Sequence, residues 1–244
     1  MTLGEDVVVI IPTYNEADTL ERTHAELRRF LPDVTVLVVD DASPDGTGAI
    51  ADNIAQQDSA THVLHRGQKD GLGGAYLAGF AWALDRNAAY ICEMDADGSH
   101  RPEDLQAMLL VADGADLTIG SRWIAGGAVR NWSWTRRWLS RAGNAYVKAM
   151  LKMPVRDATA GLRVFKAATL SGMDLSDVHS AGYCFQVDMT RRVFRAGLKI
   201  QEHPITFIER RAGASKMSNA IVREALWRVT LWGILDRFSR RRSS

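Results

Sequence analysis

Asp95 and Asp97, separated by Ala96, are the residues of this sequence with the clearest capacity for chemistry. They directly follow a short apolar run, so two carboxylates on alternate residues leave a candidate strand. Such a pair can hold a hard divalent cation, which keeps several waters and bridges phosphate oxygens. A cation in that place offsets the charge that develops on a departing nucleoside diphosphate. The pair therefore predicts a divalent-metal site that serves a phosphorylated ligand.

Two further polar turns also follow apolar runs, at residues 12–16 (PTYNE) and 40–46 (DDASPDG). Turn and capping chemistry explains each of them alone. Three acidic or polar turns at one sheet edge are costly, however, unless a cation or ligand donors neutralise them. We expect them to converge, with Asp41 meeting the base or ribose of a nucleotide and Tyr14 packing against the base.

A glycine-rich stretch, residues 69–74 (KDGLGG), follows the third candidate strand. It predicts a tight, mobile loop near the nucleotide, with Lys69 at its start. Neither a Walker A loop nor a G-x-G-x-x-G turn after the first strand is present, which argues against phosphate-loop enzymes and Rossmann-type dehydrogenases.

The first 120 residues alternate between apolar strand-like runs and helical stretches. The runs at 7–11, 34–39, 62–64, 90–94 and 117–119 predict buried strands, and 18–30, 47–56, 74–84 and 102–111 predict helices. This alternation is typical of a parallel sheet covered by helices on both faces. Ligands of such sheets bind beyond the carboxyl ends of the strands, where the three polar turns lie.

The second half of the chain has a less regular pattern. A stretch rich in Gly, Arg and Trp at 123–138 precedes an amphipathic helix at 139–151 and a loop entering a strand at 157–165. A helix at 184–195, a strand at 199–209, a flexible loop at 213–218 and an apolar helix at 219–238 complete the prediction.

The charges of the chain are strongly divided. The 244 residues carry 30 Lys and Arg against 29 Asp and Glu, a net charge of +1, which argues against a nucleic-acid binder. Residues 1–120, however, hold 7 basic against 21 acidic residues, and residues 121–244 hold 23 against 8. The basic half also holds six of the seven tryptophans, and Trp interleaved with Arg is typical of a membrane interface.

The helix at 219–238 contains five charged residues, which suit a helix lying in a membrane interface better than one spanning it. A core helix packed against the sheet is the equal alternative. No run of about 18 uncharged apolar residues occurs, and the N-terminus lacks the features of a secretory signal. With two cysteines, Cys92 and Cys184, expected as buried thiols, we predict a cytoplasmic protein.

Six motifs occur in an order that resembles one family: PTYNE, VVDDASPDGT, KDGLGGAY, EMDADGSH, GSR at 120–122 and FIERRAGASKM at 207–217. Together they resemble family-2 glycosyltransferases of the dolichol/polyprenol-phosphate mannose synthase type, over about residues 7–217. The resemblance implies a GT-A fold, that is, an α/β, Rossmann-like, mostly parallel sheet with helices on both faces. It also implies a GDP-mannose donor, a Mg²⁺ or Mn²⁺ ion, inversion at the anomeric carbon and polyprenyl phosphate mannose as product.

The same resemblance assigns site residues by position. Those for the donor are Pro12, Tyr14, Glu16, Val39, Asp41, Asp95, Ala96, Asp97, Arg210 and Lys216, to which the glycine-rich loop adds Lys69. Those for the metal are Asp95, Asp97 and Ser99, where some relatives have Gln in place of Ser99. Those for the acceptor phosphate are Arg122, Arg136 and Ser140, with Arg137 as the alternative to Arg136. Asp97, Arg122, Arg210 and Lys216 are the expected catalytic set, and residues 157–163 match a further segment near the acceptor.

The expected chemistry is a direct in-line displacement at C1 of the sugar. A phosphate monoester has a second pKa of about 6, so it is already a nucleophile near neutral pH and needs no general base. Arginine and lysine side chains would cancel the repulsion between the two anionic substrates. The alternatives are a polyprenyl-phosphate glucosyltransferase using UDP-glucose and a non-enzymatic nucleotide-binding or membrane-scaffold module.

The predicted organisation is a GT-A catalytic domain at 1–212 and a loop with a membrane-proximal amphipathic helix at 213–244. The expected partners are GDP-mannose, polyprenyl phosphate and the membrane surface, with the protein peripheral on the cytoplasmic face. Relatives often carry spanning segments or depend on a membrane-anchoring protein, so a separate anchoring protein is an open alternative here.

Overall fold

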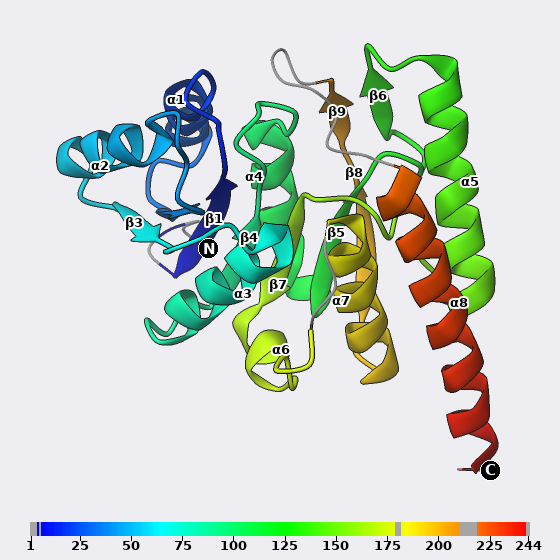
Figure 1. Ribbon diagram of the computed structural model, residues 1–244. Coiled ribbons are helices and arrows are strands. Elements are labelled where there is room, and N and C mark those ends of the chain that lie inside the picture. The colour runs from blue at the N-terminus through cyan, green and yellow to red at the C-terminus, as the bar shows by residue number, and fades with distance from the viewer. Residues whose placement is uncertain (1–3, 5, 179–181, 210–218, 243–244) are drawn as a thin grey trace.

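A seven-stranded sheet runs through the middle of the molecule (Figure 1), in a computed structural model that describes residues 4, 6–178, 182–209 and 219–242. All neighbouring strands are parallel except β7, which is antiparallel to β4 and β5 on either side of it. The strands in spatial order are β3 (Thr61–His65), β2 (Thr35–Asp40), β1 (Val7–Thr13), β4 (Tyr90–Glu93), β7 (Arg163–Lys166), β5 (Leu117–Ser121) and β8 (Ile200–Pro204).

Helices cover both faces of this sheet, because the central strands are apolar at consecutive positions and so present apolar side chains to both faces. Val7, Val9 and Ile11 of β1 join the core under α1 (Leu20–Phe30), α2 (Thr47–Gln57) and α4 (Pro102–Leu110). Val8 and Ile10 join the opposite core under α3 (Gly71–Leu84), α6 (Ala167–Ser171) and α7 (Tyr183–Arg195). The predicted parallel sheet with helices on both faces is thus confirmed. Helix α3 begins at Gly71 rather than at Gly74, so most of the predicted glycine-rich loop is the first turn of a helix.

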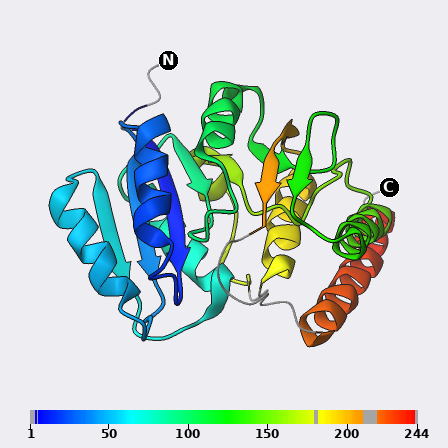
Figure 2. The ribbon, with the colours of Figure 1, turned by 90° about the horizontal axis from the view of Figure 1, so that it is seen from above.

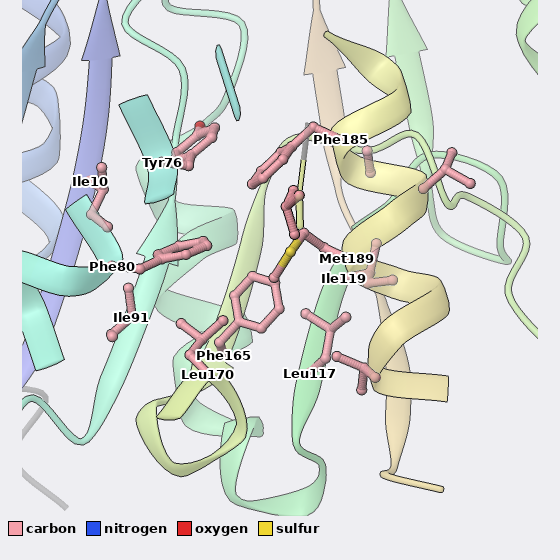
Figure 3. Close-up of a cluster of buried hydrophobic side chains, with 14 of the residues drawn as sticks. Ile10, Tyr76, Phe80, Ile91, Leu117, Ile119, Phe165, Leu170, Phe185 and Met189 are labelled. Carbon is pink, nitrogen blue, oxygen red and sulfur yellow. The ribbon is translucent and has the colours of Figure 1, made fainter. Parts of the chain in front are cut away.

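An aromatic cluster on one face of the sheet joins the two halves of the chain (Figure 3). Tyr76 of α3 stacks on Phe185 of α7, with ring centroids 5.9 Å apart and planes 9° apart. Phe80 meets Phe165 of β7 edge to face at 5.7 Å. Aromatic pairs add to the stabilisation that burial provides, so α7 is fixed against the acidic half of the molecule.

The predicted single strand at 199–209 is wrong, because two strands of different sheets occupy this segment. β8 follows β5 as far as Pro204, and β9 (Thr206–Ile208) pairs with β6 (Ala128–Arg130) in a separate two-stranded sheet. The chain turns between them at Ile205, whose N–H donates to the carbonyl of Ser121. Pro204 has no N–H to continue the ladder. The apolar pattern alone could not show this break.

Helices α5 (Trp134–Leu151) and α8 (Asn219–Arg242) lie side by side at one end of the sheet (Figures 1 and 2). α5 begins five residues before the predicted start, because the Ser133 hydroxyl accepts a hydrogen bond from the Arg136 N–H and caps the helix. On α8, Thr230 bonds to Tyr146 of α5, and Asp236 pairs with Arg191 of α7. One face of α8 is therefore packed on the domain, as the core-helix alternative requires.

The opposite face of α8 is exposed and apolar. Trp227 is 69% exposed, and Trp134 and Trp138 of the adjacent α5 are 75% and 64% exposed. Among the helices of the described residues, none has a stretch both long and apolar enough to cross a bilayer. The core-helix alternative therefore holds for one face of α8, and the membrane-interface alternative stays a prediction for the exposed face.

Candidate active site

The turns after β1 and β2 are tied together by hydrogen bonds at the carboxyl edge of the sheet. The Glu16 N–H donates to the Thr47 hydroxyl at 3.0 Å, and the Ala17 N–H donates to Asp45 at 3.1 Å. Asn15 and Ala42 adopt left-handed backbone conformations, with φ of 60° and 54°. Strained backbone of this kind persists where surrounding contacts determine it, and it is common at ligand sites. The two turns therefore form one rigid ledge.

Asp41 lies on this ledge and is 4% exposed. The Arg66 Nη1 donates to its Oδ1 at 2.6 Å, and the Asp70 N–H donates to its Oδ2 at 3.3 Å. Arg66 was not predicted from the sequence, although it immediately follows β3 at the same sheet edge. Two residues of the segment between β3 and α3 thus orient the carboxylate that is predicted to contact the nucleoside.

Lys69 and Tyr14, the residue after β1, lie in contact with each other. The Lys69 Nζ lies 3.6 Å from the centroid of the Tyr14 ring. Pro12 and Val39 are register partners in β1 and β2, and the fully buried Val39 side chain belongs to the core. The structure therefore brings together the predicted donor residues of β1, β2 and the segment after β3, with Glu16 at the end of the first turn.

Asp95 and Asp97 form the next turn along the edge, at the end of β4. The Asp97 Oδ1 accepts the N–H of Ser99 at 3.0 Å, and the carbonyl of Ala96 accepts the hydroxyl of Thr23 at 2.9 Å. His100 Nδ1 accepts the N–H of Asp95 at 3.1 Å, and its Nε2 lies 3.9 Å from Asp95 Oδ2. Both carboxylates are only partly buried, so a ligand can reach them.

A divalent cation fits this turn. Two carboxylates suit an ion whose other ligands are waters and diphosphate oxygens, and the described residues contain no group of three or more His, Cys, Asp or Glu that would suit a fully protein-ligated metal. Ser99 is fully buried, and its hydroxyl oxygen has no hydrogen-bond partner among the described residues. An unpaired buried hydroxyl is costly, so this oxygen is consistent with the predicted third ligand.

A buried polar cluster lies directly beneath the aspartate turn. Glu93, two residues before Asp95, is fully buried and accepts a hydrogen bond from Gln186 Nε2 at 2.7 Å. Its Oε2 lies 3.9 Å from Nε of the fully buried Arg163. Burial raises the pKa of Glu93 to about 7, although Arg163 and Gln186 favour the ionised form. Burial likewise lowers the pKa of Arg163 to about 10, against the pull of Glu93.

Arg122 is held in a buried ion pair with Asp157. Its backbone N–H and its Nε donate to Asp157 Oδ2 at 2.9 and 2.7 Å, and its Nη2 donates to Oδ1 at 2.7 Å. Nη2 also donates to the Thr159 hydroxyl at 3.0 Å. Arg122 is 6% exposed and Asp157 is fully buried. This bidentate pair fixes the direction of the guanidinium far more tightly than a surface ion pair would.

Arg122, Arg136 and Ser140, the three predicted acceptor residues, line one groove between α5, α7 and α8. The groove encloses about 920 Å³, its open mouth included. Thr159 joins these three polar residues. The apolar and small lining residues are Trp132, Leu139, Gly143, Tyr146, Val147, Cys184, Val187, Ala225, Leu226 and Val229.

Arg136 rather than Arg137 contributes to this groove. Arg136 pairs with Glu209 and lies 4.1 Å from the centroid of the Trp132 ring. Arg137 is exposed and donates instead to the carbonyl of Val129. Arg210 and Lys216, the other predicted cationic residues, lie outside the described residues.

The contacts that sequence reasoning missed come from polar and charged residues that are buried in the middle of the fold. Asp157 and Arg163 belong to the segment that the family resemblance singled out, but nothing in their spacing shows that they are buried. Glu93 precedes the aspartate motif, and Gln186 belongs to the helix predicted at 184–195. The pairing of β7 between β4 and β5 brings Arg163 beside Glu93, and the packing of α7 brings Gln186 to the same carboxylate.

The sheet, with its aspartate pair at the carboxyl edge, has the GT-A fold of glycosyltransferases that use nucleotide sugars. The chain belongs to Glycosyl transferase family 2, whose sequence model matches residues 8–171.

Two curated relatives match almost the whole chain. An undecaprenyl-phosphate mannosyltransferase from Micrococcus luteus is 53% identical over 232 residues, which are 95% of this chain and 96% of the relative. A polyprenol monophosphomannose synthase from Mycolicibacterium smegmatis is 51% identical over 237 residues, 96% of this chain and 89% of the relative.

Two solved structures share the fold at low sequence identity. Glucosyl-3-phosphoglycerate synthase from Mycobacterium tuberculosis, with Mn²⁺, UDP and glucosyl-3-phosphoglycerate, aligns with a TM-score of 0.65 at 18% identity, covering 96% of this chain and 80% of that one. The mannosyltransferase PcManGT from Pyrobaculum calidifontis, with GDP-Man and Mn²⁺, aligns with a TM-score of 0.61 at 18% identity, covering 97% and 65%.

Proposed function

We propose that this protein transfers mannose from GDP-mannose to a polyprenyl phosphate, with inversion at the anomeric carbon. The groove carries the proposal, because its lining combines two arginines and a serine with many apolar side chains from three helices. A lipid phosphate requires this combination, and a soluble sugar acceptor does not. The two relatives above 50% identity, both named for mannosyl transfer to a polyprenol, support the same acceptor.

The donor would bind along the ledge. Asp41 would accept hydrogen bonds from the nucleoside, and Tyr14 offers a ring face for the base once Lys69 moves from it. Asp95, Asp97 and Ser99 would hold Mg²⁺ or Mn²⁺, which when bound would stabilise the negative charge on the GDP leaving group.

The acceptor phosphate would bind at Arg122, Arg136 and Ser140, with the lipid chain in the groove. A phosphate oxygen would form the new bond to C1 as the bond from C1 to the donor's β-phosphate oxygen breaks. No proton has to be removed from the nucleophile, because the phosphate is already ionised near neutral pH. Arg122 and Arg136, together with the predicted Arg210 and Lys216, would reduce the repulsion between the two anions, so that positioning and charge stabilisation supply the rate enhancement.

Residues 213–244 would place the groove at a bilayer. We define the outer face as the exposed apolar side chains of α5 and α8: Trp134, Trp138, Leu139, Leu226, Trp227, Leu231, Ile234 and Leu235. Arg137 and Arg141 are exposed on α5 beside them. Exposed aromatic and basic side chains on interfacial helices bind lipid headgroups, so we propose a peripheral protein on the cytoplasmic face, with or without a separate anchoring protein.

A donor and acceptor screen tests the function. The purified protein is incubated with radiolabelled GDP-mannose or UDP-glucose, polyprenyl phosphate and Mg²⁺ or Mn²⁺, and the lipid product is identified by mass spectrometry. We expect a mannosyl lipid that requires both the lipid phosphate and the metal, with the β anomer as product. Transfer from UDP-glucose but not from GDP-mannose would establish a glucosyltransferase. A lack of transfer to the lipid would refute polyprenyl phosphate as the acceptor.

A further inference from the structure

Residues 157–162, which we call the bridging loop, lie between the two proposed substrate sites. The loop enters β7, which sits between β4 and β5 in the sheet (Figure 1). Strand β4 leads to Asp95 and Asp97, whereas β5 leads to Arg122. In register, Arg163 at the start of β7 lies beside Glu93 of β4 and Ile119 of β5. The bridging loop therefore occupies the space between the metal turn and the acceptor arginine.

The two ends of the bridging loop contact different sites. At one end, Asp157 and Thr159 hold the Arg122 side chain. At the other end, Gly161 lies against the aspartate turn, since a Cβ built on it would be 3.4 Å from Asp95 Oδ2 and 3.2 Å from His100 Cε1. A side chain there would crowd His100 and would also contact Asp95. The position of this loop therefore fixes Arg122 and Asp95 relative to each other.

Arg163 holds the bridging loop from the buried side. Its Nε donates to the carbonyl of Ala160 at 2.9 Å, and its Nη2 donates to the carbonyl of Ala158 at 2.8 Å. Its Nη1 donates to the Thr190 hydroxyl of α7 at 2.9 Å. Being fully buried, the side chain cannot touch either substrate from this position.

We propose that Arg163 is a positioning residue that sets the spacing between the donor's metal turn and the acceptor's Arg122. This role rests on the proposed function, because it concerns the same transfer. The guanidinium is suited to the task, since its planar fork can bond two carbonyls and a hydroxyl at once, which an ammonium cannot do in that geometry. A misplacement of about 1 Å between reacting groups can cost about 100-fold in rate.

Arg28 provides a matched control at the other end of the sheet. It too bonds two carbonyls and a threonine hydroxyl, those of Pro32, Val34 and Thr61, and it pairs with Asp58. Arg28→Lys should therefore disturb the fold in a similar way without moving either substrate site.

The test compares Arg163→Lys with Arg28→Lys in the full-length protein. We expect Arg163→Lys to lower kcat by about 100-fold, with KM for the lipid phosphate and Kd for GDP and Mn²⁺ within about threefold of wild type, because the binding side chains remain. Hydrogen exchange at residues 157–162 should become faster. Arg28→Lys should lower Tm and leave kcat and this exchange unchanged.

Thr190→Val is the milder variant if Arg163→Lys does not fold. It removes one anchor of the guanidinium, and we expect kcat to fall by about tenfold, with faster exchange at the bridging loop. A wild-type kcat in a folded Arg163 or Thr190 variant, unchanged exchange at the loop, or an equal loss of kcat in Arg28→Lys would overturn the proposal. The exchange measurement needs no substrate, so it decides how Arg163 holds the loop even if the wild-type protein fails the transferase screen.

Discussion

The donor edge and the acceptor groove differ in what holds their polar side chains. At the donor edge, hydrogen bonds from backbone N–H groups hold the turns at the ends of parallel strands. The Glu16 N–H bonds to the Thr47 hydroxyl, and the Ser99 N–H bonds to the Asp97 carboxylate. In the acceptor groove, guanidinium groups are held by carboxylates and aromatic rings, as with Arg122 on Asp157 and Arg136 on Trp132. The donor edge is therefore set by the backbone of one sheet, and the groove by side chains packed between three helices.

The two regions should therefore respond differently to substitution. Loss of a carboxylate at the donor edge removes one of only three proposed metal ligands, so its effect should be large. A change in the groove alters the fit of a long flexible chain, so its effect should be graded and should depend on acceptor length.

The largest effect is expected for Asp97→Ala. Loss of this carboxylate should lower transferase activity by about 1,000-fold in saturating Mn²⁺, because the charge on the leaving diphosphate would lose its stabilisation. Initial rates with radiolabelled donor measure the change. The exposed Asp85→Ala, at the end of α3, is the control and should retain wild-type rates. Full activity of the Asp97 variant would place the metal elsewhere.

A narrower groove should have a smaller, length-dependent effect. Gly143 of α5 lines the groove, and a Cβ built on it meets nothing within 4 Å. Gly143→Phe should therefore fold and raise KM for a long-chain polyprenyl phosphate by about tenfold, with less effect on a short-chain one and none on GDP binding. Gly143→Ala is the control, with near wild-type kinetics and about 1 kcal/mol more stability from its higher helix propensity. Equal losses on both acceptors would exclude the groove as the lipid path.

The outer face should contribute to membrane binding but not to chemistry. The double substitution of Trp134 and Trp227 by Ala should weaken binding to anionic vesicles by about tenfold in a sedimentation assay, because two large interfacial side chains are lost. Activity on a short-chain, water-soluble acceptor should stay at the wild-type level. Leu110→Ala removes an equally exposed apolar side chain from α4, which lies on a different part of the molecule, and should bind vesicles normally. High salt should weaken binding of all these proteins.

The smallest effect on activity is expected far from both regions, at Asp58. Burial opposes ionisation of this carboxyl, but hydrogen bonds from Thr61 and Arg28 outweigh it and lower its pKa from 3.8 to about 2. The folded state therefore binds the proton more weakly than the unfolded state does. Its stabilising contribution is complete above pH 3.8 and is lost as the pH falls through about 2.

Asp58→Asn should show this contribution directly. Urea unfolding at pH 7 should give a free energy of unfolding about 1 to 2 kcal/mol below that of the wild type, since a charged hydrogen-bond partner is lost. The difference should shrink below pH 3.8 and kcat should not change. A lower kcat with an unchanged free energy of unfolding would mean instead that Asp58 affects the active site.

The donor half could be predicted from sequence because its signals are local. Each apolar run of the parallel strands ends at a polar turn, so topology alone places Tyr14, Asp41 and Asp97 at one edge. In the acceptor half, no such local pattern of strand and turn places the side chains. That β7 runs antiparallel, that the chain breaks at Ile205, and that Arg163 is buried all depend on contacts between segments 40 or more residues apart in the chain.

The position of β7 also has a consequence for how the protein is made. When the ribosome has delivered residues 1–121, both β4 and β5 exist, but the strand that belongs between them has not been synthesised. Each has an unpaired edge, a feature that promotes aggregation. The place of β7 in the sheet can be filled only after residue 166 has emerged, and a protein cut between residues 121 and 163 would separate β7 from both of its partner strands. We expect coexpressed halves to associate by insertion of β7 between β4 and β5 together with pairing of β8 on β5.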